Sequence, residues 1–517
     1  MTGNAENTGG LTDRLDGTLT AMTIVSAPTP RLAGRREWAA LAVVTLAVVV
    51  LTIDATVLSL AVPALTADLS PSATAMLWIG DAYSFALAGL LVTMGTLADR
   101  IGRKRLLLIG ATGFALASLL AAFAPSAGWL IAARALLGVA GATLMPSTLS
   151  IIRSLFVDAR QRTTAIAVWS AAAGGGAALG PLVGGVLLDH FWWGSVFLLN
   201  VPVMAALVGF GAVLLPESRD PRPGPFDLPG AALSMLAIVG LVYALKETVA
   251  SGPHPGPLLT GVGGALAAAG FVRRQWRAAS PLIDVRLFAR PAFTGAVGIY
   301  LLAAFALSGL LFFLSQYLQL VHGDSPPVAG ARELPLTVAS ILVVAVTGRL
   351  VDRLGRGPVI CGGLVLSALG FAGLAAAESA RQYRWLALAL VLVGLGIGLA
   401  FTLTVDAVLT SVPPERSGSA SAVSETAYEL GVALGIGVLG SVLTALYRRA
   451  LPGNAGPAAR ESLATATAAG APLDAPRAAF VEAKQAVSLI AAAVLTLAAV
   501  IAWRVLPPDR TTTPAAH

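Results

Sequence analysis

The 517-residue sequence has little charge, one cysteine and few histidines, and each shortage narrows what the chain can be. Asp, Glu, Lys and Arg make up only 12% of the residues. This is about half the share in a soluble globular domain, so the chain has too little polar surface for a water-exposed body of its size. The single cysteine, Cys361, excludes an internal disulfide and a cysteine-based metal cluster. No Gly-rich loop ends in Gly-Lys-Ser or Gly-Lys-Thr, so nothing predicts ATP binding.

Long apolar runs occupy most of the chain, and 56% of its residues are hydrophobic. About fourteen runs are long enough to cross a bilayer as helices. They lie near 38–62, 76–98, 105–124, 129–152, 163–188, 194–215, 228–246, 257–276, 292–318, 328–350, 357–377, 384–411, 417–446 and 485–506. Because a backbone in lipid must satisfy its own hydrogen bonds, these runs predict an all-α polytopic membrane protein.

Basic residues give a formal net charge of +7, but they fall in short clusters between the apolar runs. This placement is typical of loops at a membrane surface and argues against nucleic acid as a partner. Most arginines fall on one side if the N-terminus is cytoplasmic, which predicts both termini inside and an even number of spans. We therefore expect a multi-pass protein of the inner, cytoplasmic membrane.

A charged turn occurs twice, as GTLADRIGRKR from Gly95 to Arg105 and as GRLVDRLGR from Gly348 to Arg356. Each copy must close a span at the water face, with a glycine-permitted reversal into the next span. The residues that carry the pattern are Gly95, Asp99, Arg100, Gly102 and Arg103, with Asp352 and Arg353 in the second copy. Asp99 can pair with Arg103 or with a neighbouring helix N-terminus, forming a latch on the cytoplasmic side. The alternative is a simple anchor for topology.

The spacing of the two turns predicts two six-span halves, with spans 7 and 8 inserted between them. Pro-rich stretches, LPESRDPRPGPFDLPG and SGPHPGP, support this boundary. The predicted parts are a cytoplasmic tail 1–36, an N-terminal half 37–216, an insertion 217–290, a C-terminal half 291–507 that includes an extracellular loop 448–484, and a cytoplasmic tail 508–517. We expect the long loop to carry a short surface helix.

We take six charged residues as intramembrane, five acids and one base: Asp54, Asp81, Asp406, Glu425, Glu429 and Arg134. Such an excess of acids in a cavity attracts cations. The four histidines fall in predicted outer loops or at the terminus, so proton coupling has to use carboxylates. We assign coupling to Asp54, Asp81 and Glu425, with Arg134 as a partner base. The alternatives are neutral acids hydrogen-bonded to a neighbouring helix, an interfacial Asp81 and a solvated Asp406.

Two of these acids, Glu425 and Glu429, share the stretch SETAYELGVALG with Tyr428. Helical spacing puts them on one face, and two close carboxylates in a low dielectric do not readily both ionise. We expect all three residues to bind a cationic substrate, with Trp78 as a further aromatic contact. The alternatives are a glutamate that only hydrogen-bonds between helices and aromatic rings that face lipid.

Small residues fill the fifth predicted span, and the pattern consists of Gly176, Gly180, Pro181, Gly184 and Gly185, preceded by Gly174 and Gly175. Glycines let another backbone approach closely, and the proline removes a helix hydrogen bond, so the run predicts a moving interface. Ordinary helix packing is the alternative.

Together these stretches resemble the major facilitator superfamily, and the inserted spans resemble its fourteen-helix drug:proton antiporter branch. GTLADRIGRKR resembles the signature after helix 2, and LTIDATVLSLAVPAL resembles the acidic helix-1 motif. LIAARALLGVAGATLMPSTLSII resembles the helix-4 pattern with its intramembrane arginine, and GAALGPLVGGVL the helix-5 antiporter motif. The sequence is most similar to exporters of lipophilic cations and quaternary ammonium compounds.

The resemblance implies two six-helix halves plus two inserted helices, and a secondary active transporter rather than an enzyme. It implies export of hydrophobic, mainly cationic drugs in exchange for protons, without a cofactor or metal, and it favours the latch and substrate recognition by Glu425. We expect a monomer. The alternatives are a proton-coupled exporter of an endogenous metabolite or antibiotic, and a membrane-bound enzyme or receptor. The last would need a catalytic constellation or a folded soluble module, and the longest loop holds neither.

One departure from the family pattern lies in the tenth span. ELPLTVASILVVAVTG has no acid past Glu333 and has Ser340 about where some of these exporters carry one. We therefore expect monovalent rather than divalent cations as substrates.

Overall fold

The computed structural model describes residues 32–219, 227–252, 254–278, 281–379, 382–412 and 417–506. Within these ranges 13 helices are long and apolar enough to cross a membrane, and one bent helix pair makes a fourteenth. The predicted all-α polytopic fold is confirmed. Residues 1–31 of the predicted tail 1–36 lie outside the described residues, and so does the whole of the predicted tail 508–517.

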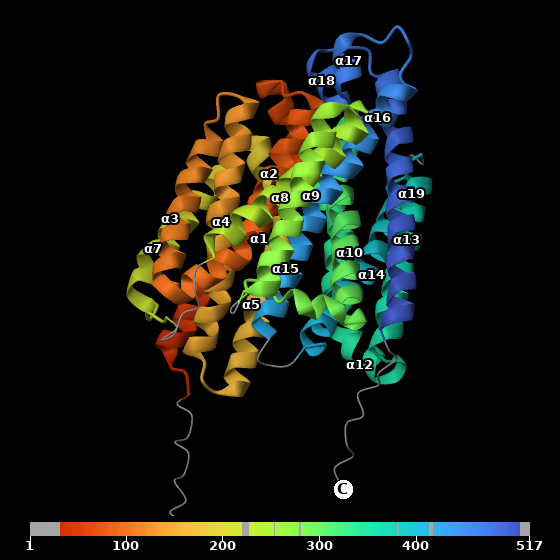
Figure 1. Cartoon of the computed structure of the whole chain (residues 1–517). Helices are drawn as coiled ribbons and strands as arrows, with labels where there is room; N and C mark the ends of the chain where they lie inside the picture. The colour runs from red at the N-terminus through yellow and green to blue at the C-terminus, as the bar shows by residue number, and fades with distance from the viewer. Residues whose placement is uncertain are drawn as a thin grey trace, which may run out of the picture.

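The N-terminal part of the chain forms a helical bundle (Figure 1). Its helices are α1 (Arg35–Leu69), α2 (Ala73–Ile101), α3 (Arg103–Ala122), α4 (Ala127–Leu155), α5 (Ala159–His190), α6 (Ser195–Leu198) and α7 (Asn200–Leu214). Helix α1 packs against α5, and α2 packs against α4. Helices α6 and α7 together make one span.

Two further helices, α8 (Leu228–Ser251) and α9 (Pro255–Arg277), form a hairpin. Helix α8 contacts α2 of the first bundle and also η4 (Gly435–Leu439) and α16 (Gly440–Ala450) near the end of the chain. The hairpin therefore lies along the seam between the two halves, as the green-yellow helices in Figure 1 show.

The C-terminal part forms the second bundle. Its remaining elements are η1 (Val285–Ala289), α10 (Pro291–Gln316), η2 (Tyr317–Val321), α11 (Pro326–Leu342), α12 (Val344–Leu354), α13 (Arg356–Ala377), α14 (Tyr383–Thr410), α15 (Ser417–Leu434), α17 (Pro457–Glu461), α18 (Leu463–Ala468) and α19 (Asp474–Val505). Helix α10 continues through a π-helical turn, η2, and α15 continues through another, η4. Helices α11 and α12 form the bent span, with an angle of 46° between them.

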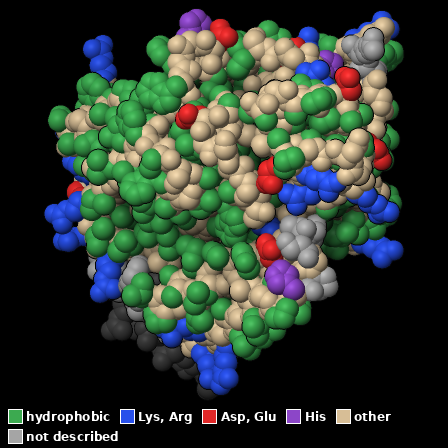
Figure 2. Space-filling view, turned by 90° about the horizontal axis from the view of Figure 1, so that it is seen from above, with side chains coloured by type: hydrophobic (Ala, Val, Ile, Leu, Met, Phe, Trp, Pro, Cys, Tyr) green, Lys and Arg blue, Asp and Glu red, His purple; other side chains and the backbone are tan. Residues whose placement is uncertain are grey.

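The two faces of the molecule differ. The α2–α3 and α12–α13 turns lie on the same face as the first and last described residues, which we call the turn face (Figure 1). The opposite face, the loop face, carries α17 and α18 (Figure 1). Seen from the loop face, hydrophobic and uncharged atoms cover most of the surface, and charged side chains are scattered (Figure 2).

The long loop is shorter than predicted, because α16 extends to Ala450 and α19 begins at Asp474. Its two short helices confirm the expected surface helix. The Glu461 carboxylate accepts a hydrogen bond of 2.7 Å from the backbone N–H of Ala73, and the Tyr447 hydroxyl donates to the Ala459 carbonyl at 2.7 Å. The loop therefore ties the second bundle to the start of α2.

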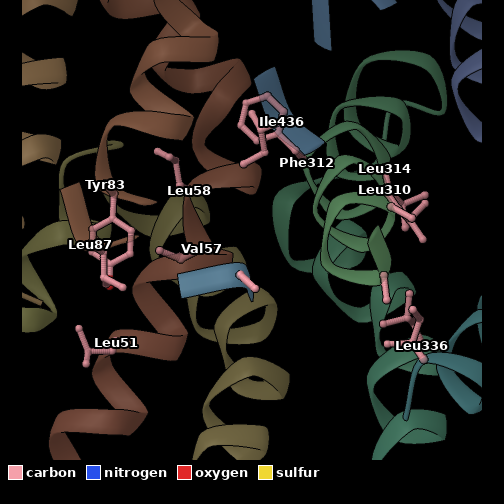
Figure 3. Packing of buried hydrophobic residues seen from close by; sticks show 14 of the residues in the cluster. Leu51, Val57, Leu58, Tyr83, Leu87, Leu310, Phe312, Leu314, Leu336 and Ile436 are labelled. Atoms are coloured by element: carbon pink, nitrogen blue, oxygen red, sulfur yellow. The ribbon is translucent and has the colours of Figure 1, made fainter. Parts of the chain in front are cut away.

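Buried apolar side chains join the halves on the loop-face side. Phe312 of α10 and Ile436 of η4 lie together between the bundles (Figure 3). A Cβ at Gly80 of α2 would lie 3.1 Å from Ile436 Cγ2, tighter than ordinary contact. The halves are thus closely packed here, and the larger cavity described below lies beside the α2–α3 turn.

Candidate functional site

The two charged turns have the backbone that their glycines predict. Gly102 has φ 111° and Gly355 has φ 87°, a region that side-chain-bearing residues rarely adopt. Asp99 pairs with Arg103 at 2.9 Å, which confirms the predicted pairing within the first turn. The Arg103 backbone N–H also donates to the Ser218 carbonyl at 2.9 Å, so the turn holds the chain that follows α7. The latch role itself stays a prediction.

The second turn binds a different acid. Arg356 pairs with Asp406 of α14 at 2.8 Å, and the Asp406 side chain is 51% exposed. Asp406 is therefore solvated at the turn face, as one of the two sequence interpretations held. Asp352 and Arg353 are exposed, as is Arg100 in the first copy.

The glycines of α5 allow two other helices, α1 and α11, to pack closely against it. A Cβ at Gly176 would lie 2.1 Å from Thr52 Oγ1, and one at Gly180 would lie 1.9 Å from Thr56 Oγ1, both on α1. A Cβ at Gly184 would lie 2.3 Å from Val57 Cγ2.

The next residues of the same pattern face α11. A Cβ at Gly185 would lie 2.7 Å from the Cα of Pro327, and one at Gly330 would lie 2.2 Å from the carbonyl oxygen of Pro181. Helix α5 therefore joins α1 of its own bundle to α11 of the other. Gly174 and Gly175, by contrast, have nothing within 4 Å of an added Cβ.

The structure brings Asp54 and Arg134 together in the interior of the first bundle. Arg134 Nη1 lies 2.8 Å from Asp54 Oδ2, and Asn200 Nδ2 donates to Asp54 Oδ1 at 2.9 Å. Arg134 also donates to the Ile79 carbonyl at 3.2 Å and lies 4.8 Å from the centre of the Tyr83 ring. Both charged side chains are buried, so neither can lose its partner without a large cost.

Asp81 has a partner that the sequence analysis missed. Lys246 of the inserted helix α8 lies 2.5 Å from Asp81 Oδ2, and both side chains are buried. Lys246 also lies 4.4 Å from the centre of the Trp78 ring, which packs near Phe85 and Tyr243. Trp78 therefore contacts α8 and is not among the residues that line the two cavities described below. Its proposed contact with substrate stays a prediction.

Other buried charges were also missed. Lys484 of α19 pairs with Glu378 at the end of α13, and Ser488 donates to the same carboxylate at 3.1 Å. Glu333 of α11 is 2% exposed, and its Oε1 has no hydrogen-bond partner among the described residues. The expected ratio of five intramembrane acids to one base is wrong. Lys246 is the last residue of a predicted span, and Glu378 and Lys484 lie just outside the predicted spans 357–377 and 485–506, but all three side chains are buried.

The inserted hairpin is fastened at the turn face by Asp227, which caps α8. Its carboxylate accepts hydrogen bonds from the Gly230 N–H at 2.9 Å, Arg274 Nε at 2.6 Å and Gln275 Nε2 at 3.0 Å. Burial raises the pKa of Asp227, but the hydrogen bonds and the Arg274 charge together outweigh it and hold the pKa below its ordinary value of 3.8. The hairpin is thus tied at one end by Asp227 and near the other by Lys246.

A cavity of about 410 Å³ lies beside the α2–α3 turn, between α2, α4, α5 and α15. Glu425 lines it, together with the paired Asp99 and Arg103. Trp169 also lines it, and the indole N–H of Trp169 is buried without a hydrogen-bond partner among the described residues. The other lining residues are Leu91, Val92, Gly95, Thr96, Met145, Pro146, Leu149, Ser150, Arg153, Leu282, Ser421 and Ala422.

A smaller pocket of about 90 Å³ lies between the halves. Glu429 lines it beside Ser84, and Tyr83 and Arg134 line it from the first bundle. Arg134 therefore contacts the pocket while it holds Asp54 behind it. Glu425 and Glu429 thus border two different cavities, one turn of α15 apart.

Tyr428 lies between these cavities in an aromatic cluster. Its ring centroid is 5.7 Å from that of Tyr300 and 5.9 Å from that of Phe401, and it lines the smaller pocket. The structure therefore groups Glu425, Tyr428 and Glu429 on one helix next to open space. No cluster of three or more metal-ligating side chains occurs in the described part of the chain.

Comparison with known proteins agrees with this fold. The family model described as the Major Facilitator Superfamily matches residues 44–436. The multidrug efflux pump LfrA of Mycolicibacterium smegmatis is 45% identical over 479 residues, which are 90% of this chain and 95% of that protein. The methyl viologen resistance protein SmvA of Salmonella typhimurium is 39% identical over 488 residues, covering 90% of this chain and 98% of that protein.

A solved structure shows the same fold at low identity. It is a crystal structure of a bacterial homologue of the human lysosomal transporter Spinster, in an inward-facing and occupied conformation. The match has a TM-score of 0.68 at 18% identity and covers 92% of this chain and 98% of that one.

Proposed function

The chain belongs to the major facilitator superfamily, and from that premise we propose that it is a proton-coupled exporter of lipophilic, mainly cationic drugs. It is a multi-pass membrane transporter. We place the turn face and both termini on the cytoplasmic side of the cell membrane, and we take the working unit to be a monomer. The names of the two relatives support a drug as substrate.

The cavity beside the α2–α3 turn is the observation that carries the proposal. Its volume of about 410 Å³ falls in the range that holds drug-sized ligands. Asp99 and Arg103 neutralise each other, and Arg153, the other base that lines the cavity, has an exposed side chain. Glu425 is the acid that lines the cavity without an ion-pair partner among the described residues. A carboxylate among apolar and aromatic side chains attracts a lipophilic cation and disfavours an anion.

The proposed proton exchange uses three charged groups that lie deeper in the protein than Glu425, namely Glu429, Arg134 and Asp54. Glu429 lies one turn along α15 and borders the same small pocket as Arg134, which is bound to Asp54. When Asp54 takes up a proton, Arg134 loses its anionic partner and is drawn toward Glu429. A neutralised Glu429 weakens the negative field at the cation site, so the proton favours release of the drug. Binding of a second cation reverses this order, which is antiport.

The test is efflux of a fluorescent lipophilic cation from a pump-deficient host that expresses the protein, with and without a protonophore. We expect efflux that stops when the protonophore is added. Continued efflux in a host without a proton gradient would contradict the proposal. A panel of unrelated cations and neutral drugs separates multidrug export from export of one metabolite or antibiotic, for which a single compound would be moved.

The same panel should include methyl viologen, which is a dication. Ser340 stands where some related exporters carry an acid, and this favours monovalent substrates. The name of the Salmonella relative, a methyl viologen resistance protein, favours a dication as substrate instead. Equal efflux of methyl viologen and a monovalent dye would remove the restriction to monovalent cations.

A further inference from the structure

The inserted helix α8 places a buried lysine against an acid of the first bundle. Lys246 Nζ is 2.5 Å from Asp81 Oδ2 and 4.4 Å from the centre of the Trp78 ring, and both charged side chains are at most 5% exposed. Asp81 Oδ1 is buried without a hydrogen-bond partner among the described residues. The carboxylate therefore has one oxygen bound to a cation and one available for a proton.

This pair lies where the two halves meet. A Cβ at Gly437 of η4 would lie 2.8 Å from Asp81 Oδ2 and 2.8 Å from Lys246 Cδ. At the preceding residue of each segment, a Cβ at Gly80 would lie 3.1 Å from Ile436 Cγ2. The π-helical segment of the second half thus covers the ion pair beside the small pocket. Separation of α2 from η4 would expose the pair.

We propose that Lys246 is the counter-ion that controls proton uptake by Asp81, and that the inserted hairpin is thereby part of the outer gate. The inference rests on the proposed proton-coupled export. With the gate closed, the bare backbone of Gly437 keeps water from the pair, and Asp81 is ionised against Lys246. When α2 parts from η4, water reaches Asp81 Oδ1 and delivers a proton from outside. The neutral acid releases Lys246, which keeps its cation–π contact with Trp78.

The surroundings of Asp81 leave Lys246 as its direct cation. Arg134 of α4 is the next base, but Asp54 of α1 holds it at 2.8 Å. Glu429 of α15 lines the small pocket beside Ser84 of α2, and Glu247 adjoins Lys246 on α8. Glu425 of α15 lines the other, larger cavity. The remaining charged groups on helices packed against α2 lie at or near helix ends: Arg35, Arg36, Glu37 and Asp68 of α1, Arg103, Lys104 and Arg105 of α3, Arg153 of α4, and Arg448 and Arg449 of α16.

The test uses proteoliposomes with a set pH on each side and a fluorescent lipophilic cation as substrate. Lys246→Met removes the charge and keeps the length of the side chain. Without the cation, Asp81 keeps its proton at higher pH, so the release-side pH for half-maximal transport should rise by about one unit or more, and turnover at pH 7 should fall about tenfold. Lys246→Arg keeps a cation and should stay within about threefold of the normal rate.

Lys484→Met is the matched control, because Lys484 is an equally buried lysine paired with Glu378 away from the α2–η4 contact. It should lower the unfolding temperature without moving the pH profile. An unchanged pH midpoint in folded Lys246→Met would overturn the inference. If that variant does not fold, loss of transport in well-folded Lys246→Arg with an unmoved midpoint would overturn it as well. Protonophore-insensitive efflux by the unmodified protein would instead reject the proposed function.

Discussion

Gly180→Ala tests whether the α1–α5 contact moves during transport or only packs. The added Cβ would lie 1.9 Å from Thr56 Oγ1 and 3.1 Å from Thr56 Cβ, where ordinary contact begins at 3.4 Å. Thr56 cannot rotate freely away, because its hydroxyl donates to the carbonyls of Thr52 and Ile53, each at 3.1 Å. The helices must therefore separate, and overpacking of this kind costs about 1–3 kcal/mol.

The assay measures thermal unfolding of the purified protein and transport per folded molecule. If the interface only packs, Gly180→Ala loses stability while the folded fraction transports normally. If it moves, as we predict, the folded fraction slows by roughly tenfold, the effect of about 1.4 kcal/mol on a barrier. Gly175→Ala is the matched control, since nothing lies within 4 Å of its Cβ. Thr56→Ala should partly rescue Gly180→Ala. Equal behaviour of the Gly175 and Gly180 variants would refute this reasoning.

Three further predictions concern single acids. Asp54→Asn keeps an acceptor for Arg134 but cannot take up a proton, so proton-driven efflux should fall to the level of the empty host; pH-dependent efflux at the normal rate would exclude the role. Glu425→Gln should weaken export of cations about tenfold more than export of neutral drugs, and equal losses would exclude recognition by charge. Asp227→Asn should destabilise the inserted hairpin by about 1 kcal/mol at pH 7. Because the Asp227 pKa is lowered on folding, its contribution is present above pH 3.8 and lost as pH falls through the folded pKa. Hydrogen exchange in α8 should thus differ between the two proteins at pH 7 and converge toward pH 3; a constant difference would contradict this.

Features set by local chemistry could be predicted from the sequence. Apolar runs determine helices in lipid, so the span count agrees with the fourteen that the structure allows. A glycine before Arg103 and another before Arg356 predict reversals, and both have positive φ. Asp99 and Arg103 are four residues apart across the reversal at Gly102, so their pairing is a local contact.

Pairs between distant helices could not be predicted in the same way. Asp81 and Lys246 are 165 residues apart, and Glu378 and Lys484 are 106 apart. A hydropathy pattern also ends a predicted span where charged residues begin. Lys246 is the last residue of the predicted span 228–246, so the pattern places it at a helix end, although α8 continues to Ser251. The pairing of Arg134 with an intramembrane acid could be predicted only because a buried base is stable when an acid neutralises its charge, and Asp54 is that acid.

The most direct measurement follows protons and drug together in one preparation. Purified protein is reconstituted into vesicles that contain a pH-sensitive dye, and a lipophilic cation is added on one side in the absence of a pH gradient. We predict that cation movement drives protons in the opposite direction, and that Asp54→Asn vesicles show neither flux. Cation transport by the unmodified protein with no accompanying proton movement would contradict proton antiport.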